Sequence, residues 1–346
     1  MNGKEKDVKD LSYGMQGYLV TLLQYALKRA GMDVGNLDGI FGRRTAKALL
    51  RFQQEQGLCA AGIVGQLTWA ALYPYITGYT LHRRGPEETA TVALDLPVVT
   101  QELPCSHLLI HLMLKGLTMR YPFLRVYEIG RSVMGRPIQA VSMGKGKKQI
   151  GFVGPHHASG GGIVLGMLQA LEEYAAALDE GGSLDGMPAM ALFDAVTLHI
   201  VPLVNPDGVD LATGALDSMD SFYVQAQALA AHYPGIPFPD GWLANISGVD
   251  LAIQYSLGWE AARRIRFAQG FTRPGPRDYV GSEPLIAPEA RAMAKWVKQM
   301  DFSMILSYDA GFTDWFTASY ARQGLTLQEK TRDILPILGQ SIPLSP

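Results

Sequence analysis

The stretch that decides the fold is Ile150–Ala175, IGFVGPHHASGGGIVLGMLQALEEYA. A short apolar run ends at Gly154-Pro155, two histidines and three consecutive glycines follow, and apolar residues then recur at helical spacing. The pattern predicts a strand, a tight loop and a helix. In an open α/β sheet, ligands bind at the loops that follow the carboxyl ends of the strands. His156 and His157 lie in that loop, so we expect other loops at the same edge to supply their partners.

The segments around this stretch continue the alternation of strands and helices. An amphipathic helix is expected over His107–Tyr121, a strand over Pro137–Met143, and a buried strand within Thr197–Leu211 that ends in a polar loop. His199 lies inside that apolar strand, where a hydrogen-bonded core histidine is more typical than a metal ligand. The alternation predicts an α/β domain with a doubly wound mixed sheet.

This domain, residues 106–346, resembles the zinc carboxypeptidase family in its bacterial cell-wall branch, the γ-D-glutamyl–diaminopimelate peptidases. The matching segments are the two histidines before Ala158, RVYEIGRSVMGRPIQAVSMG at 125–144, Asn-Pro-Asp-Gly at 205–208, and GWEAARRIRFAQGFTRPGPRDYVGSEPL at 258–285. The resemblance implies a carboxypeptidase-type sheet, a zinc cofactor and hydrolysis of peptidoglycan stem peptides. It also implies that the C-terminal part of this chain is shortened.

The metal ligands implied by the resemblance are incomplete. The family's His-x-x-Glu places its histidine on His157 and its glutamate on Gly160, which has no side chain. Its third ligand, a histidine after the strand at 305–308, is replaced by Asp309. His157 and Asp309 are therefore the candidate metal ligands. Because a catalytic zinc ion takes three protein ligands, we expect zinc to be absent or weakly bound.

The polar groups that the family uses for catalysis also differ. Family members have Arg before Gly-Val-Asp and Asn after the following Leu, whereas this chain has Ser247 and Ala252. Loss of one oxyanion donor costs about a hundred- to a thousandfold in rate. The glutamate that serves as base falls on Gln328, and the adjacent Glu329 faces the opposite side of a strand. We therefore assign no catalytic residue.

Four interpretations follow for the α/β domain. The one we favour is a pseudoenzyme with impaired or lost activity that binds wall peptides. An active zinc peptidase cleaving γ-D-glutamyl–diaminopimelate bonds would instead need ligands from Glu172, Asp309 or Glu329. Ser159 could be a nucleophile, although the first glycine of Gly-x-Ser-x-Gly is absent. The glycine loop could also hold a peptide carboxylate through backbone N–H groups. The candidate substrate-binding residues are Ser159, Gly160, Gly161 and Ser247.

The N-terminal residues 12–73 predict a small three-helix domain. A helical repeat stops at Gly31, and a turn at Asn36–Thr45 leads into the second helix. The segments DGIFG at 38–42 and GIVG at 62–65 resemble the peptidoglycan-binding-like domain, which implies peptidoglycan as the partner. Its marker residues are expected to hold the small core while other surface positions contact the wall; they are Asp38, Gly39, Phe41, Gly42 and Trp69.

Composition limits the remaining possibilities. We interpret residues 74–105 as a linker, loosely similar to the opening of a LysM repeat and so a relic of one. The 30 Lys+Arg against 32 Asp+Glu in 346 residues give no sign of a nucleic-acid-binding surface. The two cysteines, Cys59 and Cys105, fall in different predicted domains, which argues against a disulfide. With no apolar signal core and no spanning stretch, we expect no membrane span. The location would be cytoplasmic, or at the wall or spore through non-standard export.

Overall fold

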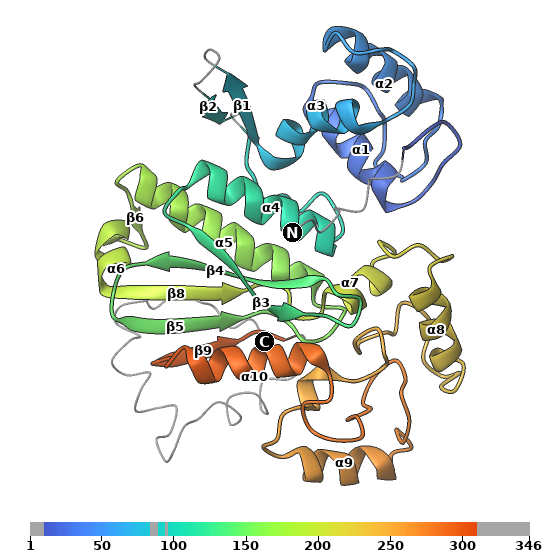
Figure 1. Ribbon diagram of the computed structural model, residues 1–346, viewed down its shortest axis with the longest axis vertical. Helices are drawn as coiled ribbons and strands as arrows, with labels where there is room; N and C mark the ends of the chain where they lie inside the picture. The colour runs from blue at the N-terminus through green and yellow to red at the C-terminus, as the bar shows by residue number, and fades with distance from the viewer. Residues whose placement is uncertain (1–9, 84–88, 94–95, 310–346) are drawn as a thin grey trace, which may run out of the picture. The chain divides into compact units, whose positions relative to one another are not determined.

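The computed structural model describes residues 10–83, 89–93 and 96–309 of the chain (Figure 1). The chain divides into two compact units, which we describe separately. Unit 1 comprises Met1–Leu103 with His111–Arg120, and unit 2 comprises Pro104–Ile110 with Tyr121–Pro346. Among the described residues, no helix is both long enough and apolar enough to cross a membrane.

Unit 1 begins with three helices, as predicted for the N-terminal domain, and adds a hairpin and part of a fourth helix. Its elements are α1 (Tyr18–Arg29), α2 (Arg43–Glu55), α3 (Gln66–Thr77), β1 (Tyr79–Arg83), β2 (Thr89–Ala93) and the His111–Arg120 part of α4 (His107–Arg120). Strands β1 and β2 pair antiparallel, within the segment that we interpreted as a linker.

The marker residues of unit 1 occupy structural positions. Phe41 is fully buried, and Gly39 adopts a positive φ of 69°. A Cβ at Gly39 would stand 2.9 Å from Thr21 Oγ1, so the turn needs glycine. Gly42 directly precedes α2, and Trp69 lies half-buried on α3.

Unit 2 is organised around a five-stranded sheet with the order β3-β4-β8-β5-β9. The strands are β3 (Arg125–Arg131), β4 (Pro137–Gly144), β5 (Lys148–Val153), β8 (Val196–Val201) and β9 (Met304–Ser307). β4 is antiparallel to both β3 and β8, whereas β8, β5 and β9 run parallel. The predicted mixed α/β sheet is confirmed.

Helices cover both faces of this sheet, as a doubly wound fold requires. In Figure 1, α5 (Gly161–Asp179) lies along one face and α10 (Pro288–Gln299) along the other. The remaining elements are β6 (Ser183–Leu184), β7 (Met187–Pro188), α6 (Ala189–Ala195), α7 (Pro206–Ala212), α8 (Ser221–Ala230), the 3₁₀ helix Leu251–Ile253 and α9 (Trp259–Ala268).

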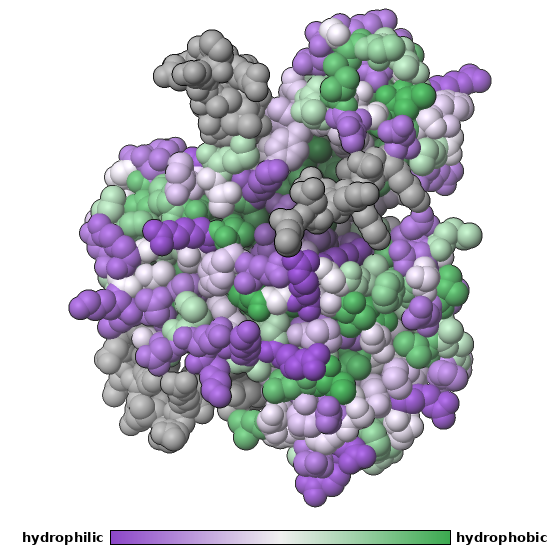
Figure 2. Space-filling model, viewed as in Figure 1, coloured by the Kyte–Doolittle hydropathy of each residue, from purple (hydrophilic) through white to green (hydrophobic). Residues whose placement is uncertain are grey.

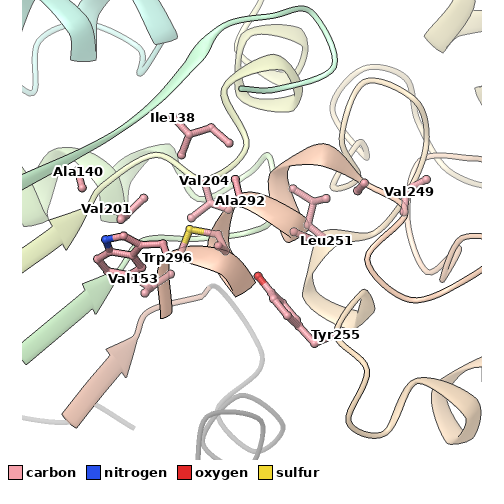
Figure 3. Packing of buried hydrophobic residues seen from close by; sticks show 13 residues of the cluster. Ile138, Ala140, Val153, Val201, Val204, Val249, Leu251, Tyr255, Ala292 and Trp296 are labelled. Carbon is pink, nitrogen blue, oxygen red and sulfur yellow. The ribbon is translucent and has the colours of Figure 1, made fainter. Parts of the chain in front are cut away.

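The core beneath α10 extends to the segment that carries the candidate site. Met293 and Trp296 of α10 pack against buried strand residues such as Ile138 and Val201 (Figure 3). The same cluster includes Val249, Leu251 and Tyr255, which surround Asp250 in the chain. Each fully buried large apolar side chain contributes about 1.5–3 kcal/mol. This packing fixes the position of the 249–255 segment against the sheet.

His199 is a hydrogen-bonded core residue, as predicted. It is 6% exposed, with Nδ1 2.9 Å from the Tyr127 hydroxyl and Nε2 2.6 Å from Gln149 Oε1. Trp296 Nε1 donates to the same Tyr127 hydroxyl at 3.1 Å. Burial lowers the pKa of His199, so the ring is held in its neutral form.

Candidate functional site

The candidate site lies where three parallel strands end. His156 and His157 follow β5, Asn205 follows β8, and Asp309 follows β9. Parallel register places these carboxyl ends at one edge of the sheet. A fourth segment, around Asp250, completes the site. The loop singled out from the sequence therefore receives partners from the same edge, as expected.

His157 lies between two carboxylates. Its Nδ1 is 3.1 Å from Asp309 Oδ1, and its Nε2 is 3.4 Å from Asp250 Oδ1. The side chains of His157 and Asp309 are each 2% exposed. The structure thus brings together the two candidate metal ligands and adds Asp250, which the sequence argument missed. Asp250 belongs to the Gly-Val-Asp segment, so its identity was visible, but nothing local indicated its contact with His157.

The two carboxylates decide the charge of the imidazole. Burial alone would lower the pKa of His157, but hydrogen bonding and Coulombic attraction from Asp250 and Asp309 raise it to about 10. Burial would likewise raise the pKa of Asp250, yet the contact with His157 and backbone N–H groups lower it. His157 is therefore an imidazolium held by acidic neighbours.

His156, the adjacent histidine, has a different environment. It is fully buried, its Nε2 is 2.6 Å from the Tyr255 hydroxyl, and its backbone N–H donates to Asp309 Oδ2 at 3.2 Å. Burial, opposed in part by nearby Asp309, lowers the pKa of His156 to about 4. Two neighbouring histidines therefore carry different charges at neutral pH, because one faces carboxylates and the other a hydroxyl.

Asn205 fastens the histidine loop to the rest of the site. Its Nδ2 donates to the carbonyls of His156 at 2.9 Å and Ala244 at 3.0 Å. Its Oδ1 accepts from Gly208 N at 3.0 Å, which caps α7. The Asn-Pro-Asp-Gly motif quoted from the sequence thus positions two loops and starts a helix.

Ser247 lies on the loop before Asp250 and is exposed. Its backbone N–H donates to Asn245 Oδ1 at 3.1 Å, and Asn245 Nδ2 donates to Glu289 Oε2 at 3.1 Å. Burial raises the pKa of Glu289 to about 7. The position that carries arginine in the family therefore presents a small hydroxyl on a rigidly held turn.

The glycine loop is closely packed at Gly160, the position where the family has its second metal ligand. A Cβ at Gly160 would overlap the ring of Pro155, and a Cβ at Gly161 would stand 2.8 Å from Cys105 Cβ. Ser159, directly before Gly160, is exposed. A glutamate at position 160 would need Pro155 to move, so this loop is built for glycine and not for a ligand side chain.

Zinc, the metal expected for the family, does not fit a catalytic site made from the described residues. Within residues 10–83, 89–93 and 96–309, no group of three His, Cys, Asp or Glu side chains is placed to hold a metal ion. His157 and Asp309 supply two donors, fewer than the three of catalytic zinc sites. Gln328 and Glu329 lie outside the described residues.

The geometry gives little support to Glu172 as a metal ligand or to Ser159 as a nucleophile. Glu172 lies on α5, well beyond the loop that carries His157. Ser159 would need a neutral histidine as its base, but His157 faces carboxylates through both ring nitrogens and His156 faces Tyr255.

Comparisons with known proteins agree with the sequence resemblance. The family model for zinc carboxypeptidase matches residues 110–338, and the model for a putative peptidoglycan binding domain matches residues 16–72. Gamma-D-glutamyl-L-diamino acid endopeptidase 1 of Lysinibacillus sphaericus is 34% identical over 195 residues, which are 56% of this chain and 48% of that protein.

Two further matches are more limited. The uncharacterized protein YqgT of Bacillus subtilis (strain 168) is 34% identical over 181 residues, 52% of this chain and 46% of that one. The chain thus spans about half the length of these curated relatives. Thrombin activatable fibrinolysis inhibitor superposes with a TM-score of 0.44 and 17% identity, over 59% of this chain and 47% of that structure.

Proposed function

Because this chain belongs to the zinc carboxypeptidase family and carries a peptidoglycan-binding domain, we propose that it binds peptidoglycan stem peptides without hydrolysing them. The N-terminal domain directs the chain to the wall. The carboxypeptidase-type domain then acts as a pseudoenzyme, a peptide-binding scaffold in place of a peptidase.

The observation that carries this proposal is the pairing of His157 with two carboxylates. A histidine that binds zinc offers one ring nitrogen to the metal and uses the other to contact a second-shell partner. Here Asp250 contacts one nitrogen and Asp309 contacts the other. Under this proposal the side chain that follows β9 pairs with the His157 ring, whose pKa its acidic neighbours raise, and does not join it around a cation. The packing of Gly160 against Pro155 supports the same conclusion.

The choice of stem peptide rests on the relatives. The similarity to a γ-D-glutamyl-L-diamino acid endopeptidase supports a ligand with a γ-D-glutamyl–diamino acid linkage. The exposed Ser159 and Ser247, which flank the buried cluster in the chain, are the groups we assign to peptide contact.

The competing function is hydrolysis by a zinc ion with an atypical ligand set. To separate the two, the purified full chain would be incubated with zinc, dialysed, and measured for metal content. The same sample would be tested for cleavage of L-alanyl-γ-D-glutamyl-diaminopimelic acid and for its binding by calorimetry. We expect well under one zinc per chain, no cleavage and saturable binding.

A matched pair of variants sharpens this experiment. Asp309→Asn removes a candidate ligand, whereas Asp179→Asn changes an exposed aspartate at the end of α5. Under our proposal neither variant changes zinc content. One zinc per wild-type chain, lost in Asp309→Asn and accompanied by peptide cleavage, would establish the peptidase and refute the proposal.

A further inference from the structure

The peptidoglycan-binding unit contains the same loop twice. DGIFGRRT at 38–45 joins α1 to α2, and AGIVGQLT at 61–68 joins α2 to α3. Each copy has a glycine with positive φ, an exposed isoleucine, a glycine that precedes a helix, and a threonine in the first turn. The exposed isoleucines, Ile40 and Ile63, are 46% and 47% exposed. The chain therefore provides its own matched pair of loops.

A buried glutamine holds each copy in the same way. Gln24 Nε2 donates to Ile40 O at 3.2 Å and Thr45 Oγ1 at 3.1 Å, and its Oε1 accepts from Gly39 N at 2.9 Å. In the first copy, Gln24 also donates to Asp38 Oδ1 at 2.8 Å. The Asp38 carboxylate therefore accepts a hydrogen bond that helps to hold its own loop.

In the second copy, Gln53 takes the equivalent place. Its Nε2 donates to Ile63 O at 2.9 Å and Thr68 Oγ1 at 3.0 Å, and its Oε1 accepts from Gly62 N at 3.1 Å. Ala61 stands where the first copy has an aspartate. Apart from the Asp38 contact, the frameworks match, so the other differences between the copies come from side chains outside the glutamine contacts.

Those side chains make one copy cationic and leave the other uncharged. Arg43 and Arg44 stand between the second glycine and the threonine of the first copy, and Arg44 lies over Gly35. The second copy has Gln66 and Leu67 there, with Leu67 76% exposed. Figure 2 shows hydrophobic residues at the surface of the α1–α3 region, interspersed with hydrophilic ones.

The second copy lines a cavity of about 720 Å³. Asp10 is the charged residue among those that line this cavity. The next residue, Leu11, is held by two backbone hydrogen bonds: Leu11 N donates to Val64 O at 3.2 Å, and Val64 N donates to Leu11 O at 2.8 Å. These bonds fix the position of Asp10. Asp10 Oδ1 lies 3.5 Å from where a Cβ on Gly65 would stand. Ile63 and Leu67 line the same cavity and add apolar surface to it.

From this arrangement we propose that the cavity is the wall-contacting subsite of unit 1 and binds the diamino acid of a stem peptide. The ligand's side-chain ammonium pairs with Asp10, and its methylene groups lie on Ile63 and Leu67. The volume is within the range of small-ligand sites, roughly 300–1,000 Å³. A glycan strand carries no cation for the carboxylate, so charge complementarity favours the peptide. The inference rests on the proposed function for its choice of peptidoglycan as ligand.

The chain carries a built-in reporter for this cavity. Cys59 lines it and is exposed, whereas Cys105, the other cysteine of the chain, is buried and burial raises the pKa of its thiol. A thiol reagent applied to the full chain therefore modifies Cys59 first. Occupancy of the cavity would be read as slower modification of Cys59, located by mass spectrometry.

The probe is L-alanyl-γ-D-glutamyl-L-lysine, compared with the same peptide acetylated on the lysine side chain. We expect the free amine to slow modification about tenfold at ten times its dissociation constant, by mass action. The acetylated peptide should give no protection. Asp10→Asn and Ile63→Ser should abolish protection, whereas Ile40→Ser in the first loop and Glu55→Gln on α2 should retain it.

Three outcomes would overturn the proposal. They are protection that survives Asp10→Asn, equal protection by the acetylated peptide, and protection by N-acetylated chito-oligosaccharide but not by the tripeptide. Absence of protection by every probe would refute it as well. Zinc content and peptide cleavage, which separate the proposed function from hydrolysis, do not depend on Asp10. Calorimetry on the Asp10→Asn variant would show whether peptide still binds elsewhere in the chain, so failure of one proposal is distinguishable from failure of the other.

Discussion

Two loops at the same edge of the sheet serve different purposes. The loop after β8 holds neighbouring segments together, because Asn205 caps α7 and donates hydrogen bonds to the carbonyls of His156 and Ala244. The loop after β5 precedes α5 without a side-chain cap, and it places His157 between Asp250 and Asp309. Asn205 of the first loop makes neutral hydrogen bonds, whereas His157 of the second loop contacts two buried carboxylates.

The difference shows how a scaffold can keep its shape while its reacting groups change. Neutral hydrogen bonds between loops contribute to stability whatever the chemistry of the site. A buried imidazolium is stable only while both carboxylates face it, because unpaired buried charge is costly. We therefore expect substitutions in the second loop to be the more damaging ones.

The largest effect is expected for His157→Gln. Removal of the cation leaves the buried carboxylates of Asp250 and Asp309 without their shared positive partner. Breaking such a buried pair costs about 3–5 kcal/mol in the free energy of unfolding. Urea denaturation at pH 7 would measure it, with the exposed His232→Gln as control, expected within about 0.5 kcal/mol.

The double variant His157→Gln/Asp309→Asn tests the cause. If repulsion between carboxylates produces the loss, removing one of them should recover part of the stability. A single variant as stable as the wild type would show that His157 is not held as an imidazolium.

A smaller loss is expected for Asn205→Ala. The substitution removes a helix cap and leaves the His156 carbonyl without its donor, while the Ala244 carbonyl keeps only its contact with Trp242 Nε1. Together these changes cost about 2–3 kcal/mol. Asp220→Ala is the control, because Asp220 caps α8 through a contact with Phe222 N at 2.8 Å. That variant should lose about 1 kcal/mol. Equal losses would mean that Asn205 is only a cap and does not fasten the histidine loop.

The smallest effect is expected for substitutions of two glycines at the start of α5, Gly160 just before the helix and Gly162 within it. Gly160→Ala would bring a methyl group against Pro155, with an expected cost of roughly 1–2 kcal/mol. Gly162→Ala faces open space on α5 and should gain up to about 1 kcal/mol from helix propensity. Thermal denaturation of both variants would measure the difference. Similar melting temperatures would show that Pro155 yields easily and that position 160 could accept a larger side chain.

Particular residues show how much of the structure could be predicted from the sequence. The β5–loop–α5 unit followed from apolar spacing and the glycines, and the hydrogen-bonded state of His199 followed from its place in an apolar strand. His157 and Asp309 were paired through family resemblance, and the structure brings them together. Asp250 and Tyr255 were not found as partners of the two histidines, because they lie about 100 residues further along and contact them only when the strand ends converge.

The sequence by itself determined the two kinds of unit, the order of strands and helices, and the absence of a side chain at position 160. These follow from local spacing and residue type, which the chain carries wherever it folds. Only the tertiary structure decided that His157 is flanked by carboxylates on both sides, that Pro155 fills the space beside Gly160, and that one of two matched loops lines a cavity. Contacts and charge states of this kind depend on which distant side chains meet in a buried space.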